Sequence, residues 1–183
     1  VLHGDGSHAG QGVEYEPYDM SALPEYTVGG TMHIVVNNQV AFTTDPRFSR
    51  SSDYCTDVAK GVDAPIFHVN GDDVEAVCEV MKLAVEYRQA SKSDRVVDIV
   101  CYRKFGHNEI DEPMFTQPLM YQVIKKHPNV LDVYTKKLKS EGAVSDAEID
   151  AIKKSCKAIL NEEFEAGKTY EPAPRDWLAS HWE

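Results

Sequence analysis

The spacing of apolar and polar residues divides this sequence into short strands and longer helices. Three runs are rich in β-branched residues and almost continuously apolar, at residues 33–36, 65–69 and 96–102. Such runs are typical of strands that are covered on both faces in a parallel sheet. Val1 reads as the middle of another strand, and no initiator Met or signal peptide is present, so we expect a piece of a longer chain.

A helical pattern separates the second and third apolar runs. Apolar side chains over residues 72–88 largely follow a spacing of three and four, and Asp72 or Asp73 can cap the first turn. Strand, helix and strand in this order predict a right-handed crossover between parallel strands. We therefore predict an α/β fold in which helices flank a parallel sheet.

The later part of the sequence is predicted to be mainly helical. Helices are expected over 120–126, 130–141 and 145–165, and Ser145 with Glu148 has the spacing of a capping box. From Thr169 onward, prolines and tryptophans predict an irregular, docked tail. Residues 1–118 are thus expected to form the α/β core, and residues 119–183 a helical extension of the same domain.

Composition narrows the functional classes. The net charge of −11, from 19 basic and 30 acidic residues, argues against a nucleic-acid or anionic-membrane surface. No apolar run approaches the roughly 20 residues that span a bilayer. The four cysteines are far apart and form no CxxC pair, so we expect reduced, buried or half-buried thiols rather than a zinc site or disulfides.

Oxygen-bearing residues follow two of the predicted strands. Asp5 comes after the first strand, and Asn37-Asn38 after the second. A carboxylate, the Asn38 amide oxygen and the backbone carbonyl of Val40 are the ligands that Mg²⁺ prefers. Gly6 allows the backbone to approach a phosphate, and residues 9–12 can start a helix whose amides face it. Alone, Asp5 could cap a helix and the asparagines could form a plain turn; together they favour a metal–diphosphate site.

Longer strings resemble one family closely. The chain is similar to the thiamine-diphosphate-dependent decarboxylating component of the 2-oxoglutarate dehydrogenase complex. The similarity is specific from His3 to about Leu138 and weaker beyond. The matching strings lie at residues 3–5, 9–13, 36–44, 50–52, 54–57, 64–70 and 101–109.

The resemblance implies roles for individual residues. Asp5, Asn38 and the Val40 carbonyl would hold Mg²⁺ and the diphosphate of thiamine diphosphate. Arg103 matches a position near the phosphates. His107 matches a loop histidine on the thiazolium side and is the candidate catalytic residue, a reading that we weigh against a plain surface histidine.

The resemblance also implies a reaction and partners. The activity would be oxidative decarboxylation of 2-oxoglutarate, a step of the citric acid cycle, with transfer of the succinyl group to a lipoyl domain of the dihydrolipoyl succinyltransferase. Family members form homodimers. The sequences of the motifs look more like those of mitochondrial than of bacterial members, which favours the mitochondrial matrix over a bacterial cytoplasm. The aminopyrimidine-activating glutamate and the substrate-binding histidines lie outside these residues, so the chain alone is expected to be inactive.

Several points stay open. The same chemistry on 2-oxoadipate, a non-catalytic magnesium–diphosphate module and a plain α/β scaffold remain alternatives. The family places small or apolar residues at Gly6-Ser7-His8, and Glu14 and Pro17 also depart from its pattern, so the helix after Gly12 either ends early or is remodelled. His3 either faces the cofactor or packs. The remaining histidines are read as structural: His33, His68, His127 and His181.

Overall fold

The computed structural model describes residues 1–172 and divides the chain into two compact units, Val1–Tyr134 and Thr135–Glu183. The second unit begins inside a helix that crosses the boundary. The elements of the first unit, in chain order, are β1 (Leu2–Gly4), α1 (Asp5–Gly10), α2 (Gly12–Met20), β2 (Met32–Asn37), α3 (Pro46–Ser49), the 3-10 helix η1 (Asp57–Val62), β3 (Ile66–Asn70), α4 (Val74–Ser91), β4 (Arg95–Val100) and α5 (Pro118–Ile124).

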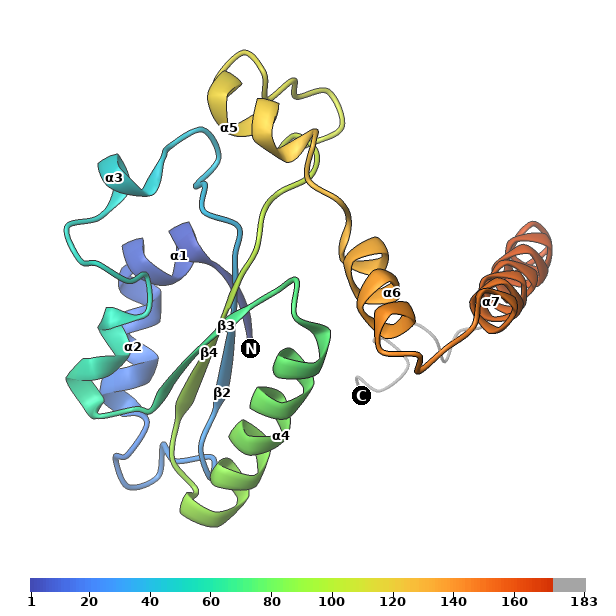
Figure 1. The fold of residues 1–183 in the computed structure, drawn as a ribbon. Helices are drawn as coiled ribbons and strands as arrows, with labels where there is room; N and C mark the ends of the chain where they lie inside the picture. The colour runs from blue at the N-terminus through green and yellow to red at the C-terminus, as the bar shows by residue number, and fades with distance from the viewer. Residues whose placement is uncertain (173–183) are drawn as a thin grey trace. The chain divides into compact units, whose positions relative to one another are not determined.

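The four strands form one parallel sheet in the order β1-β2-β4-β3 (Figure 1). Gly4 of β1 pairs with Val36 of β2, and Val36 pairs with Ile99 of β4. Ile99 also pairs with Val69 of β3, so the four strands finish at nearly the same level. The predicted α/β class with a parallel sheet is confirmed.

Helices cover both faces of the sheet. The connections from β1 to β2 and from β2 to β3 carry α1, α2 and η1, which lie on one side, whereas α4 lies on the other (Figure 1). The connection from β3 back to β4 runs across the sheet in the opposite direction. Because crossovers keep one hand, reversing the direction moves the helix to the opposite face.

The hydrophobic core has two parts, one on each face of the sheet. Val35 and Val96 pack with Tyr18 and other residues of the α2 and η1 side. Val97 packs with Val69 and other residues of the α4 side. Neighbouring positions of β4 therefore face different cores, which is why the sequence of this strand is continuously apolar rather than alternating.

The structure refines three local expectations. The third predicted strand ends at Val100 rather than Tyr102. A helix does start within residues 9–12, at Gly12, but a further helix that was not predicted starts at Asp5, and Gly4 rather than Asp5 is its N-cap. Of the two alternatives for Pro17, an early end of the helix is not found, because Pro17 lies inside α2 and the helix continues to Met20.

The predicted helix caps are found. The Asp73 side chain accepts a hydrogen bond from the Ala76 amide at the start of α4. In the second unit, α6 (Val130–Ser140) is followed by α7 (Asp146–Gly167), whose capping box of Ser145 and Glu148 is formed. Most of the expected docked tail lies outside the described residues, and the single-domain division at residue 118 stays a prediction.

The state of the cysteines and the character of the helices bear on two expectations drawn from composition. All four cysteines are free thiols; Cys55 is buried and Cys101 half-buried, but Cys78 and Cys156 are exposed, which corrects the expectation of covered thiols. Within residues 1–172, none of the helices has the length and apolar character needed to cross a membrane.

Candidate functional site

Asp5 and the Asn38 turn meet at the carboxyl edge of the sheet. Asp5 directly follows Gly4, whose partner on β2 is Val36, so the chain leaves both strands side by side. The first turn of α1 then lies against the segment after β2. A Cβ at Gly6 would stand 2.4 Å from the Ala41 Cβ, a separation that no side chain tolerates. Glycine at position 6 therefore permits the close approach of these two segments.

The Asp5 carboxyl is buried without a full set of partners. The residue is only 2% exposed, and its Oδ1 accepts no hydrogen bond. Burial raises the pKa of this carboxyl; Arg50 opposes the rise and Asp98 adds to it. Backbone hydrogen bonds and Arg50 compensate the charge of a carboxylate in this position only in part, and a bound cation would supply the rest.

The turn after β2 is held in an unusual conformation. Gln39 adopts a positive φ of 63°, which a residue with a side chain rarely takes up without a structural reason. Its side-chain amide donates to the Cys101 carbonyl at 2.8 Å, and the Val40 amide donates to Asn38 Oδ1 at 3.3 Å. The neighbouring Asn37 Oδ1 is buried and accepts no hydrogen bond. These hydrogen bonds hold residues 38–40 in one conformation and connect the turn to the end of β4.

The loop after β4 carries the two remaining predicted site residues. Arg103 donates through Nε to the Tyr121 hydroxyl at 3.0 Å, whereas its buried Nη2 has no partner. The His107 ring is exposed and lies edge-on to Phe42, with 4.9 Å between ring centroids. Phe42 belongs to the segment after Asn38, so the loop with His107 and the metal-candidate turn are in contact.

A comparison with known sequences decides the family. The family model of the dehydrogenase E1 component matches residues 1–175. The chain belongs to this family. The 2-oxoglutarate dehydrogenases, mitochondrial, of Schizosaccharomyces pombe and Saccharomyces cerevisiae are 56% and 53% identical to it. The 2-oxoglutarate dehydrogenase E1 component of Brucella anthropi is 50% identical. Each alignment covers 100% of this chain but only 18% of the relative.

The E1 family is dependent on thiamine diphosphate, and the carboxyl edge of this E1 chain fits a metal-bound diphosphate. Two buried side-chain oxygens, on Asp5 and Asn37, have no hydrogen-bond partner, and a buried Arg103 nitrogen on the neighbouring loop has none either. Unpaired buried polar atoms are rare in folded proteins and commonly face a ligand or ion. The oxygen donors suit a hard divalent cation, and the guanidinium suits a phosphate.

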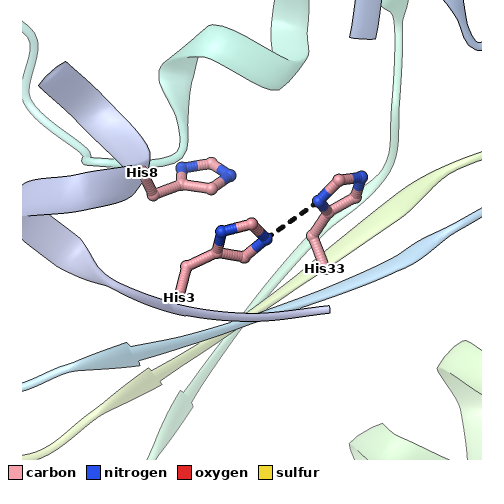
Figure 2. Close-up of side chains that lie close together, drawn as sticks. All are labelled: His3, His8 and His33. Atoms are coloured by element: carbon pink, nitrogen blue, oxygen red, sulfur yellow. Dashed lines mark hydrogen bonds between the residues drawn. The ribbon is translucent and has the colours of Figure 1, made fainter. Parts of the chain in front are cut away.

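The structure also brings together three histidines that sequence reasoning treated separately. His3, His8 and His33 are all buried, and one ring nitrogen of each lies within 4.8 Å of the others (Figure 2). His33 was interpreted as structural, and His8 was seen only as a departure from the family. The signal that could have found the group is spacing, because His3 and His33 precede Asp5 and Asn37 by even numbers of residues on adjacent strands.

Proposed function

We propose that this E1 chain supplies the magnesium and diphosphate part of the active site in an enzyme that decarboxylates 2-oxoglutarate oxidatively. The succinyl group would pass to a lipoyl carrier. Asp5, Asn38 and the carbonyl of Val40 would hold Mg²⁺. The observation that carries this proposal is the buried Asp5 carboxyl, whose unpartnered oxygen lies where β1 and β2 leave the sheet together.

Each residue has a defined task in this proposal. Asp5 contributes the negative charge that binds Mg²⁺, and the fixed turn from Asn38 to Val40 presents two neutral oxygens to the same ion. Gly6 would bring the first turn of α1 close to the turn after Asn38, so that its backbone can approach the diphosphate, and Arg103 would direct its free guanidinium nitrogen to a phosphate oxygen. Orientation and charge neutralisation are thus the contributions of these residues.

His107 would act at the reacting end. Its exposed ring can donate a hydrogen bond to the substrate carboxylate or transfer a proton, while the contact with Phe42 fixes its position. The bound thiamine diphosphate supplies an electron sink for the loss of carbon dioxide. The loops around residues 43–64 and 105–118 would exclude water from that step.

Partners and location follow from the relatives. The relatives named 2-oxoglutarate dehydrogenase support 2-oxoglutarate as substrate and a lipoyl domain of a succinyltransferase as acceptor. We infer the mitochondrial matrix as location, since three of the relatives, from two yeasts and Dictyostelium discoideum, are named mitochondrial. The homodimer is inferred from the family resemblance alone. Fractionation of the source cells and the mass of the purified protein test these two inferences.

The test uses the full-length protein with Asp5→Ala. Removing the ligand should weaken the binding of Mg²⁺ and thiamine diphosphate by more than about 100-fold, beyond the range for changes around a metal ligand. Release of carbon dioxide from 2-oxoglutarate should vanish. Asp19→Ala removes an exposed carboxylate from α2 and is the matched control. Parallel assays with 2-oxoadipate identify the substrate, and undiminished turnover in Asp5→Ala would overturn the proposal.

A second test concerns the isolated chain. Residues 1–183 cover 18% of the related enzymes, so they should release no carbon dioxide from 2-oxoglutarate in the presence of cofactor and Mg²⁺. Radiometric or coupled detection of carbon dioxide measures this directly. Turnover by the purified chain would show that the rest of the protein is not needed for decarboxylation.

A further inference from the structure

The three buried histidines form a compact group on the face of β1 and β2 that α1 and α2 cover. His3 Nε2 and His33 Nδ1 are 3.0 Å apart across the two strands (Figure 2). His8 reaches the same place from α1, and its ring is almost perpendicular to that of His3, with centroids 5.0 Å apart. His8 is fully buried, and the other two are less than a tenth exposed. Three nitrogen donors therefore converge in a largely buried space.

Two of the three rings are held from outside the group through their other nitrogen. His3 Nδ1 lies 3.2 Å from Glu14 Oε1, whereas His33 Nε2, 3.8 Å from Asp94 Oδ2, is buried and makes no hydrogen bond. His8 Nδ1 donates to the Cys55 carbonyl at 2.9 Å. Histidines that bind metals are oriented in the same manner, by carboxylates and carbonyls on the nitrogen that is not bound.

The inner nitrogens of His3 and His33 share either a proton or a cation. If His3 donates its outer proton to Glu14, its inner Nε2 is unprotonated and accepts from His33 Nδ1 at 3.0 Å. The outer Nε2 of His33 is then a buried atom without a hydrogen-bond partner. A cation on the two inner nitrogens would move the His33 proton to Nε2, on the side of Asp94. Burial lowers the pKa of His33 to about 4, so an additional proton is a costly solution at neutral pH.

We propose that His3, His8 and His33 bind a borderline divalent transition-metal ion, with Zn²⁺ as the expected occupant. Imidazole nitrogens at about 2.0–2.1 Å suit Zn²⁺, and three of them with one further ligand make a tetrahedral site. Mg²⁺ prefers oxygen, so it would not compete for this site. The site is therefore chemically distinct from the oxygen donors around Asp5.

An access route and a competing hydrogen bond define how the ion would enter. A cleft of about 390 Å³ is lined by His3, Glu14, His33 and Asp94 among other residues, and it leads to two of the three rings. The Tyr18 hydroxyl lies 2.8 Å from His8 Nε2 and occupies that nitrogen. Metal binding requires this hydroxyl to turn away or to become the fourth ligand.

The experiment measures Zn²⁺ binding to the full-length protein after chelator treatment and saturation with Mg²⁺ and thiamine diphosphate. His33→Gln and His8→Phe should each lose one equivalent of tight Zn²⁺, measured by competition with a chelating dye. His127→Gln is the control, because that exposed ring pairs with Asp72 outside the group. With Co²⁺ in place of Zn²⁺, the parent should give the intense visible band of a tetrahedral site.

Glu14→Gln provides a variant that leaves all three rings in place. Its loss of charge should weaken Zn²⁺ binding by about 10–100-fold without removing the site, as expected for a residue that orients a ligand. This variant guards against misfolding of the histidine variants, and circular dichroism of all proteins checks their structure. Equal Zn²⁺ stoichiometry and affinity in the parent, His8→Phe and Glu14→Gln would overturn the proposal.

Discussion

The two ends of the same face of the sheet carry different kinds of metal-binding atom. At the carboxyl edge, Asp5 and the Asn38 turn present oxygen atoms, whereas closer to the amino ends His3 and His33 present nitrogen atoms. Residues separated by two or four positions share a face of a strand, so His33 and Asn37 of β2 lie on the same side of the sheet. One pair of strands thus offers hard and borderline ligands a few residues apart, and the side chains rather than the fold decide which ion each end prefers.

The two regions also differ in how they are supported. The histidines are enclosed by β1, β2, α1 and α2, and their exposure is small. The carboxyl edge depends on turns and loops, in which both Gln39 and Phe42 have positive φ values and His107 is exposed. Functional groups on loops can adjust when a ligand binds, whereas a buried group is preformed. We therefore expect binding of the cofactor and Mg²⁺ to order the carboxyl edge and to leave the histidine region unchanged.

Asp5→Asn tests whether the two regions act independently, and it has the largest expected effect. The amide keeps the size of the carboxyl but lacks its charge, so Mg²⁺ and cofactor affinity should fall by more than about 100-fold. Zn²⁺ binding at the histidines should not change, because their ligands are untouched. Calorimetric titration with each ion measures both. A parallel loss of Zn²⁺ binding would mean that the two regions form a single site.

Acidification should affect the histidine region first. Burial lowers the pKa of His33 to about 4, whereas an unfolded histidine titrates near 6.5. The unfolded state therefore gains a proton before the folded state does. The stability from neutral His33 is complete above about pH 6.5 and is lost as the pH falls toward 4, at most about 3 kcal/mol.

Calorimetric melting of the full-length protein between about pH 7 and pH 5 measures this loss. His33→Gln removes the titrating ring, so its melting temperature should depend less on pH than that of the parent. His127→Gln, in an exposed pair, should keep the parent's dependence. Identical pH slopes in the parent and His33→Gln would contradict the assignment.

Gly6→Ala should damage mainly the carboxyl edge. The new methyl group would stand 2.4 Å from the Ala41 Cβ, so α1 or the turn must move, at a cost of about 1–3 kcal/mol. Cofactor affinity should fall with it. Gly10→Ala is the matched control on the same helix, because its added Cβ meets nothing within 4 Å. If both alanines behave alike, close packing at position 6 does not shape the site.

The parallel sheet and the proximity of the segments that begin with Asp5 and Asn38 could be predicted from the sequence. Apolar runs mark the strands, and polar residues mark the points where the strands end. The end of β4 could not be placed, since Tyr102 is as strand-compatible as Val100 and only the end of the partner strand at Asn37 sets the limit. Pro17 left two alternatives, an early end of its helix or local remodelling; on the exposed face of α2 the missing amide interrupts one turn without ending the helix.

The histidine group illustrates the information that local patterns lack. Its members come from β1, α1 and β2, and their convergence depends on strand register and on the packing of a short helix. Neither quantity is encoded in the spacing of apolar residues. The partner of Arg103 was hidden for the same reason, because Tyr121 lies on α5 beyond a long loop.

Tyr121→Phe has the smallest expected effect and tests the loop support of the carboxyl edge. The buried hydroxyl donates to the Phe105 carbonyl at 2.9 Å and accepts from Arg103 Nε, so its removal leaves both groups unpaired. We expect a local loss of about 1–2 kcal/mol. Hydrogen exchange over residues 103–111 should accelerate and cofactor affinity should fall severalfold, while exchange in β1 and β2 stays constant. Tyr87→Phe on α4 is the control; faster exchange throughout the sheet would show that the loop and the histidine region are not separate in stability.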